Sequence, residues 1–123
     1  MKMAIILAGA HYAGKSKTIR LHLKPLLKIS IKAHKFTLRC KRGFILSQSF
    51  EEAKRDVKAT VKRYSNYDLL VFAARPQNEP GSKLKLMRSV LLKASFTVRI
   101  VTIQSPKEAK KKALEIFNFL KSA

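Results

Sequence analysis

Residues 9–16 carry the side chains whose types and spacing could do chemistry. They read Gly-Ala-His-Tyr-Ala-Gly-Lys-Ser, which fits a template of one glycine, four residues of any type, and then Gly-Lys-Ser/Thr. In such a stretch a turn containing glycines wraps its backbone N–H groups around a chain of phosphates. Lys15 would reach the outer phosphates as a point charge, and the Ser16 hydroxyl would hold Mg²⁺. The octet therefore predicts a site for a polyphosphate with Mg²⁺.

The segments on either side have the lengths needed to position this octet. Residues 3–8 form a short apolar run of strand length. Residues 14–28 are expected to form a helix, because apolar side chains recur at helical spacing, at Ile19, Leu23 and Leu26 or Leu27. The first N–H groups of that helix would favour an anion, and glycines allow the positive φ of a tight turn. Pro25 predicts a kink or an early end near residue 24.

With a strand before it and a helix after it, the octet resembles the phosphate-binding loop of the P-loop NTPase superfamily. The resemblance is strong over residues 3–28 and continues as an order of elements beyond them. It implies an α/β fold with a mostly parallel sheet, which binds a nucleoside triphosphate, ATP or GTP, with Mg²⁺. The nucleotide-binding residues that it implies are Gly9, Ala10, His11, Tyr12, Ala13, Gly14, Lys15, Ser16 and Lys17, with Ser16 as metal ligand.

The remainder of the chain predicts alternating strands and helices. The expected elements are a hairpin with strands at 36–40 and 44–47 and a turn at 41–43, a helix to residue 64, a strand at 68–74, a helix at 82–93, a strand at 96–103 and a terminal helix. Ser49 and Glu52 form a predicted capping box. We therefore expect one domain over residues 1–123, a three-layer P-loop-type fold with a small, mostly parallel sheet, one hairpin and helices on both faces.

Ligands in such sheets bind beyond the carboxyl ends of the strands. That edge would collect residues 47–49, 75–81 and 104–105 beside the octet. Gln48 and Arg75 therefore join Lys15 as candidate catalytic residues, Gln48 to orient a nucleophile and Arg75 to contact transferred phosphate. The alternative interpretations are an ordinary loop amide for Gln48 and an ion pair with Glu79 for Arg75.

One feature of the superfamily has no equivalent in this sequence. P-loop enzymes usually place an acidic residue at the carboxyl end of a second apolar strand. In this chain that end carries Ala74 and Arg75, and Asp68 lies at the opposite end. The nearest carboxylates are Glu51 and Glu79, so metal binding would depend on Ser16, phosphates and water.

The charge distribution opens a second hypothesis. The chain has 27 Lys and Arg against 7 Asp and Glu, and no acidic residue precedes Glu51. Such a field attracts polyanions: a nucleotide, a nucleic acid or an anionic membrane surface. The leading hypothesis is a small P-loop protein with a phosphotransferase or weak NTPase activity. The alternatives are a nucleic-acid-binding module with a vestigial phosphate loop, in which Phe36 and Phe44 flank a basic hairpin tip, and a degenerate P-loop protein that acts as an interaction partner.

The remaining expectations concern location and redox state. The single cysteine, Cys40, excludes an internal disulfide and is expected to be half-buried in a strand. No apolar run has the length of a membrane span. We therefore expect a cytoplasmic protein.

Overall fold

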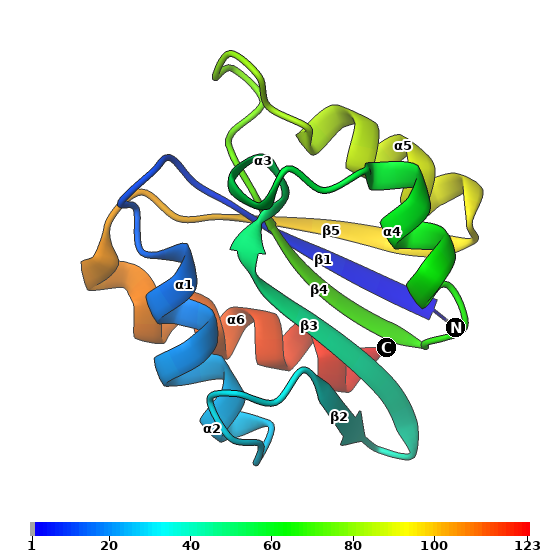
Figure 1. Ribbon diagram of the computed structural model, residues 1–123. Helices are drawn as coiled ribbons and strands as arrows, with labels where there is room; N and C mark the ends of the chain where they lie inside the picture. The colour runs from blue at the N-terminus through cyan, green and yellow to red at the C-terminus, as the bar shows by residue number, and fades with distance from the viewer. Residues whose placement is uncertain (1) are drawn as a thin grey trace.

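A five-stranded sheet lies at the centre of the computed structural model, which describes residues 2–123 (Figure 1). Its strands are Lys2–Ala8 (β1), Lys35–Leu38 (β2), Lys41–Ser49 (β3), Leu69–Ala74 (β4) and Phe96–Thr102 (β5). Their order across the sheet is β2-β3-β4-β1-β5. Every neighbouring pair is parallel except β2 and β3, which form the hairpin. The expected α/β architecture with a mostly parallel sheet is confirmed.

Two layers of helices cover the sheet. One layer contains a continuous helix made of α1 (Lys15–Lys17), η1 (Thr18–Leu23) and α2 (Lys24–Leu26), together with the turn η2 (Pro106–Glu108) and α6 (Ala109–Ser122). The other layer contains α3 (Phe50–Ala53), α4 (Val57–Tyr64) and α5 (Leu84–Lys93). Ile5 and Leu7 of β1 pack under the first layer, and Ala4 and Ile6 pack under the second. Because both faces of β1 are buried, its sequence is apolar almost throughout.

The connections open a crevice at the carboxyl edge of the sheet. The chain leaves β1 toward the layer of α1 and α6, whereas it leaves β3 and β4 toward the layer of α3, α4 and α5 (Figure 1). Connections that depart to opposite faces leave a space between them, which is where ligands bind in open α/β sheets. The 9–16 loop lies beside this space.

The helix after β1 accommodates Pro25 differently from the expected kink or early end. The helix widens to π-type geometry over Thr18–Leu23, where the N–H of Lys24 donates to the carbonyl of Ile19, five residues earlier. Pro25 follows this widened segment, and the helix continues to Leu26. A proline ring clashes with the carbonyl four residues earlier in a regular α-helix, so the wider turn before Pro25 relieves that contact.

The hairpin turn lies at residues 39–40, and not at the predicted residues 41–43. Arg39 and Cys40 form a two-residue turn with φ of 52° and 67°, and β3 begins at Lys41. Two positive φ values match the right-handed twist of the strands, although neither residue is the glycine or asparagine that such a turn favours. Cys40 is therefore exposed in a turn, and the expectation that it is half-buried in a strand is wrong.

Gly43 was assigned to the turn but lies inside β3, opposite Phe36. A Cβ at this position would fall inside the Phe36 ring. We expect Gly43→Ala to lower the free energy of unfolding by about 1–3 kcal/mol, because the buried ring must move. A urea titration measures this change. In a Phe36→Leu background the same substitution should cost less, and an equal cost in both backgrounds would contradict the contact.

The second predicted helix is broken into two. Lys54 has φ of 52° and ends α3, and the Asp56 side chain then accepts a hydrogen bond from the N–H of Ala59 at 2.8 Å to begin α4. The break keeps α3 as a short turn beside the carboxyl end of β3. Glu52 of this turn therefore lies near the crevice.

Candidate anion-binding site

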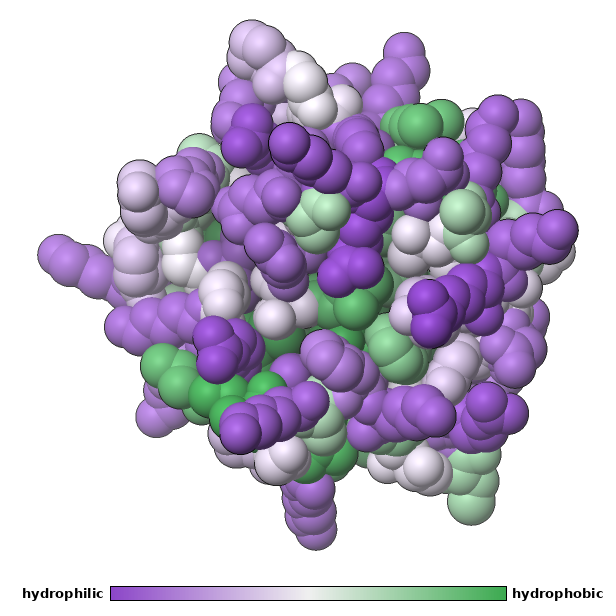
Figure 2. Space-filling view, in the orientation of Figure 1, coloured by the Kyte–Doolittle hydropathy of each residue, from purple (hydrophilic) through white to green (hydrophobic). Residues whose placement is uncertain are grey.

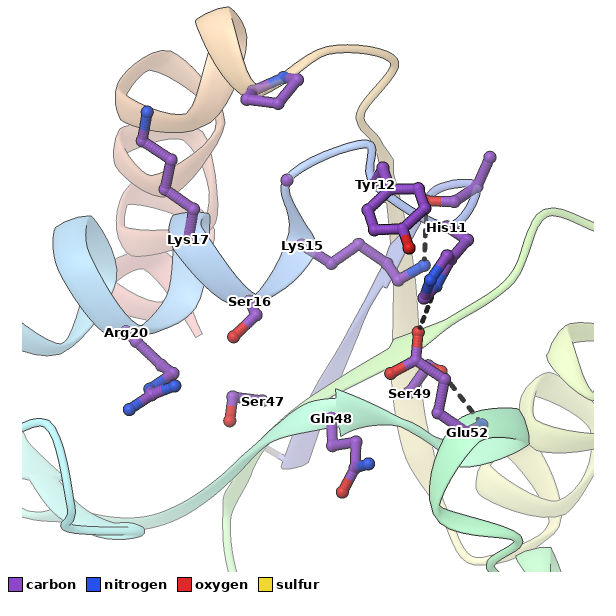
Figure 3. Close-up of a pocket in the computed structure, with 13 residues that line it drawn as sticks. His11, Tyr12, Lys15, Ser16, Lys17, Arg20, Ser47, Gln48, Ser49 and Glu52 are labelled. Carbon is purple, nitrogen blue, oxygen red and sulfur yellow. Dashed lines mark hydrogen bonds and ion pairs between the residues drawn. The ribbon is translucent and has the colours of Figure 1, made fainter.

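A cavity of about 500 Å³ lies between the 9–16 loop and the end of β3 (Figure 3). Seven of the nine nucleotide-binding residues predicted from the sequence line it: Ala10, His11, Tyr12, Gly14, Lys15, Ser16 and Lys17. Ser47, Gln48 and Ser49 line the opposite side. The structure thus brings most of the octet and one of the predicted edge segments together around one space.

The two glycines of the octet are required by neighbouring segments of the chain. A Cβ on Gly9 would lie 2.8 Å from the carbonyl oxygen of Ile103, and one on Gly14 would lie 2.8 Å from Cα of Pro106. Gly14 also has φ of +97°, as the sequence analysis anticipated. Gly9 and Ala13 are buried and do not line the cavity. Tight packing against the segment after β5 therefore fixes the shape of the loop.

The Lys15 side chain folds back into the 9–16 loop and binds its backbone. This side chain is only 6% exposed, and its ammonium group donates to the carbonyl of Gly9 and, at 3.3 Å, to that of Ala10. Burial lowers the pKa of Lys15, while the nearby carboxylates, Glu52 first, act in the opposite direction. A buried cation held mainly by carbonyl groups is well placed to exchange those partners for an anion.

The helix that follows presents its first turn to the cavity. The N–H and the hydroxyl of Thr18 both donate to the carbonyl of Gly14, at 2.9 and 2.7 Å. The N–H groups of the three residues before Thr18 have no carbonyl one turn earlier in the helix. All three of these residues, Lys15, Ser16 and Lys17, line the cavity, and Ser16 points toward Ser47 (Figure 3). The arrangement offers N–H donors and a positive dipole end to an anion.

A bulge brings β3 to the cavity. The strand advances four residues, from Ile45 to Ser49, while its partner β4 advances only two, from Val71 to Ala73. The extra residues leave the ladder, and Ser47 and Gln48 reach the cavity. The amide group of Gln48 points away from the 9–16 loop (Figure 3), an orientation that does not favour a role in orienting a nucleophile there.

Glu52 is the carboxylate at the cavity, and sequence reasoning assigned it elsewhere. The N–H of Glu52 donates to Ser49 at 3.2 Å, as a capping box requires, but its carboxylate binds His11 at 3.0 Å. This contact joins the 9–16 loop to α3 across the mouth of the cavity (Figure 3). Glu52 lies in the first helical turn after a strand, and this position in the sequence could have identified it as a carboxylate at the cavity.

The two carboxylates that the sequence analysis considered lie elsewhere. Glu51 accepts the N–H groups of Arg75 and Lys83, at 3.0 and 2.6 Å, and so ties the end of β4 to the start of α5. Glu79 lies 3.7 Å from Nε of Arg75. Neither lines the cavity, and Arg75 does not line it either. The ion-pair interpretation of Arg75 therefore agrees with the structure.

Arg20 is a cation at the cavity that the motif did not predict. It lies four residues after Ser16, so both residues share one face of the helix. The spacing of four residues from Ser16 could therefore have identified Arg20 as a residue of the site. The cations Lys15, Lys17 and Arg20 line the cavity together with the single carboxylate of Glu52, so the lining carries an excess of positive charge.

Most cations of the chain have no carboxylate partner in the part that the structure describes. Of the 27 Lys and Arg side chains, only Arg75 and Lys112 form ion pairs with a carboxylate. Seven carboxylates cannot pair with 27 cations, and three of the seven, Glu51, Asp56 and Glu108, accept backbone N–H groups as well. The fold uses its few acidic residues to hold its turns and helix ends, so its positive surface is left uncompensated.

Two searches of residues 2–123 bear on metals and membranes. No group of three or more His, Cys, Asp or Glu side chains is arranged to hold a metal ion among them. Within the same residues, none of the helices combines the length and the apolar character needed to cross a bilayer.

Comparisons with known proteins do not identify a family. The chain matches no protein-family model, no curated protein and no solved structure, so the case for a function depends on the geometry of the cavity itself.

Proposed function

We propose that this protein binds a nucleoside triphosphate, ATP or GTP, together with Mg²⁺, in the cavity beside the 9–16 loop. One observation carries the proposal: a buried lysine, the first turn of a helix and a second cation from that helix surround one cavity. These are Lys15, Ser16 and Arg20. Backbone N–H groups and a helix dipole favour phosphate, and the resemblance of residues 9–16 to a phosphate-binding loop supports the same ligand.

The oxygen donors at the cavity suit Mg²⁺ as part of a nucleotide complex. The Ser16 hydroxyl and the Glu52 carboxylate are hard oxygen ligands, the class that Mg²⁺ prefers. They are too few to hold the ion alone, so phosphate oxygens and water would complete its coordination. When bound, Mg²⁺ would neutralise phosphate charge. The chain's own residues would bind the phosphates through the Lys15 ammonium and the first N–H groups of the helix.

A phosphotransferase or weak NTPase activity is the chemistry that this site would carry. Of the three candidate catalytic residues, only Lys15 lines the cavity with its charged group directed toward the loop. Arg75 lies outside the cavity, and the Gln48 amide points away from the loop. Binding is therefore the core of the proposal.

Calorimetric titration tests the proposal directly. At about 0.15 M salt, where surface charges are largely screened, Mg-ATP or Mg-GTP should bind with one site per chain. The affinity should fall from triphosphate to diphosphate to monophosphate, because fewer oxygens remain for Lys15 and the helix N–H groups. Absence of saturable binding at that salt concentration would reject the proposal.

The pH dependence of binding should follow Lys15. Burial lowers the pKa of Lys15 in the free protein, whereas a bound polyphosphate would favour the charged ammonium and raise that pKa. Affinity should therefore fall as pH rises above the lowered pKa of Lys15, and binding there should take up protons. Calorimetry in buffers of different ionisation enthalpy measures this uptake. A pH-independent affinity up to the ordinary pKa of lysine would contradict it.

Nucleic-acid binding is a second candidate, favoured by the uncompensated cations. It depends on charge alone, because Phe36 and Phe44, which the sequence placed beside a basic tip, are buried in the core and cannot stack on bases. A salt titration with single-stranded RNA discriminates. Specific phosphate contacts give a steep fall of log affinity against log salt that persists to physiological salt, whereas binding seen only at low salt would reject this candidate.

A further inference from the structure

A second, smaller hollow continues the cavity along the same helix. It has a volume of about 210 Å³ and is lined by Ser16, Lys17, Arg20, Leu21 and Ile31. Three of these residues, Ser16, Lys17 and Arg20, also line the cavity beside the 9–16 loop. The two hollows are therefore adjoining parts of one depression that runs from the start of the helix along its exposed face. We call the smaller part the side groove.

The side groove differs from the cavity in having apolar walls. Leu21 is 55% exposed and Ile31 is 40% exposed, although both are large aliphatic residues. Figure 2 shows an apolar patch over the second half of this helix and the turn after it, surrounded by hydrophilic atoms. Apolar side chains gathered in a hollow beside charged residues are typical of ligand sites.

The apolar walls are held in place by a buried lysine. Lys24 is almost fully buried, and its ammonium group donates to the carbonyl of Ile31 at 2.8 Å. This bond ties the turn after the helix back onto the helix itself. Ile31 is thereby held near Leu21 in the described structure, with no ligand present.

We propose that the side groove receives the nucleobase of the nucleotide whose phosphates occupy the cavity, and that it holds purines without distinguishing adenine from guanine. This inference depends on the proposed function. Leu21 lies five residues beyond Ser16, more than one turn along the widened helix, which leaves room for a ribose between the phosphates and the base. Lys17 and Arg20 lie between the two ends and carry charge that suits an anion.

The lining explains the lack of base selectivity. Discrimination between bases requires polar groups placed against their hydrogen-bonding edges, as in sites that reject ligands lacking a partner. The side groove has neither a carboxylate nor a carboxamide in its lining. Leu21 and Ile31 offer only apolar contact, and the Arg20 guanidinium can stack on a ring or donate to N7, an acceptor that adenine and guanine share. Every purine offers such faces.

The experiment compares Mg-ATP, Mg-GTP and Mg-tripolyphosphate by calorimetry at physiological salt. ATP and GTP should bind with affinities within about three-fold of each other, and both should bind more tightly than tripolyphosphate. The variant Leu21→Ser/Ile31→Ser should weaken ATP binding by about five-fold or more, from lost apolar contact, and leave tripolyphosphate binding unchanged. Leu114→Ser is the matched control, since Leu114 is an exposed leucine on α6 and is 51% exposed. It should change neither affinity.

The outcomes separate the two proposals. If tripolyphosphate binds as tightly as ATP, or if the double variant weakens both ligands equally, the side groove is not the base site, although the phosphate site stands. If the ATP and GTP affinities differ by more than about three-fold in either direction, the lack of selectivity is wrong. If none of the three ligands binds, both proposals fail. Circular dichroism of each variant verifies that the fold is retained.

Discussion

Replacing Lys15 by methionine should lower the affinity for Mg-ATP by about 10- to 100-fold. Hydrogen bonds to charged groups contribute roughly 1.5–3 kcal/mol each, and Lys15 is the buried cation closest to the loop carbonyls. Methionine has a similar length and an apolar stem, so it fills the same space without the charge. Isothermal titration at physiological salt measures the change.

The matched control for Lys15 is Lys62→Met. Lys62 is an exposed lysine in the last turn of α4 and does not line the cavity. The control changes the net charge by the same amount, so it reports the long-range electrostatic effect alone. If the two variants lost affinity equally, the nucleotide would be attracted by the overall positive charge, and the assignment of Lys15 to the phosphates would be wrong.

Replacing Gly14 by alanine should both destabilise the protein and abolish measurable nucleotide binding. The residue has φ of +97°, and a Cβ would lie 2.8 Å from Cα of Pro106, which is backbone and cannot rotate away. The backbone strain costs about 1–2 kcal/mol, and the steric overlap adds about 1–3 kcal/mol. Relief requires the loop to separate from η2, which would disperse the N–H groups at the start of the helix. Thermal unfolding and Mg-ATP titration measure the two effects.

Gly81 provides the control for backbone strain. It has φ of +80°, yet nothing lies within 4 Å of its would-be Cβ. Gly81→Ala should therefore cost only the strain, about 1–2 kcal/mol, and leave nucleotide affinity unchanged. Equal losses of stability for Gly14→Ala and Gly81→Ala would mean that the Pro106 contact adds nothing to the strain.

The local pattern of the chain was enough to predict most elements of the fold. The strands at 3–8 and 68–74 are continuous apolar runs, and each is buried on both faces as β1 and β4. Such runs are diagnostic because a parallel strand between two helical layers has no polar face. Ser49 caps α3, as the predicted capping box requires. Apolar runs and helix caps depend only on residues that are close together in the sequence, so they can be predicted from it.

The sequence does not show which glycines are required by packing against another segment. Gly43 was assigned to a turn, but it is required under the ring of Phe36. A Cβ on Gly9 would meet Ile103, a requirement that the octet by itself does not show. A glycine has the same appearance in a sequence whether it supplies a positive φ or makes space for another segment. Only the packing shows which.

The sequence by itself determined the α/β class, the order of the elements and the octet at residues 9–16, because periodicity and short-range spacing encode them. The tertiary structure decided which side chains meet the octet. Glu51 accepts the N–H of Arg75, and Glu79 pairs with the Arg75 side chain, which lies outside the cavity. Glu52 lies at the cavity and binds His11. The physical reason is that a carboxylate near the end of a strand has several backbone N–H groups within reach. The relative position of the strand ends, set by the sheet register and the bulge in β3, selects among them.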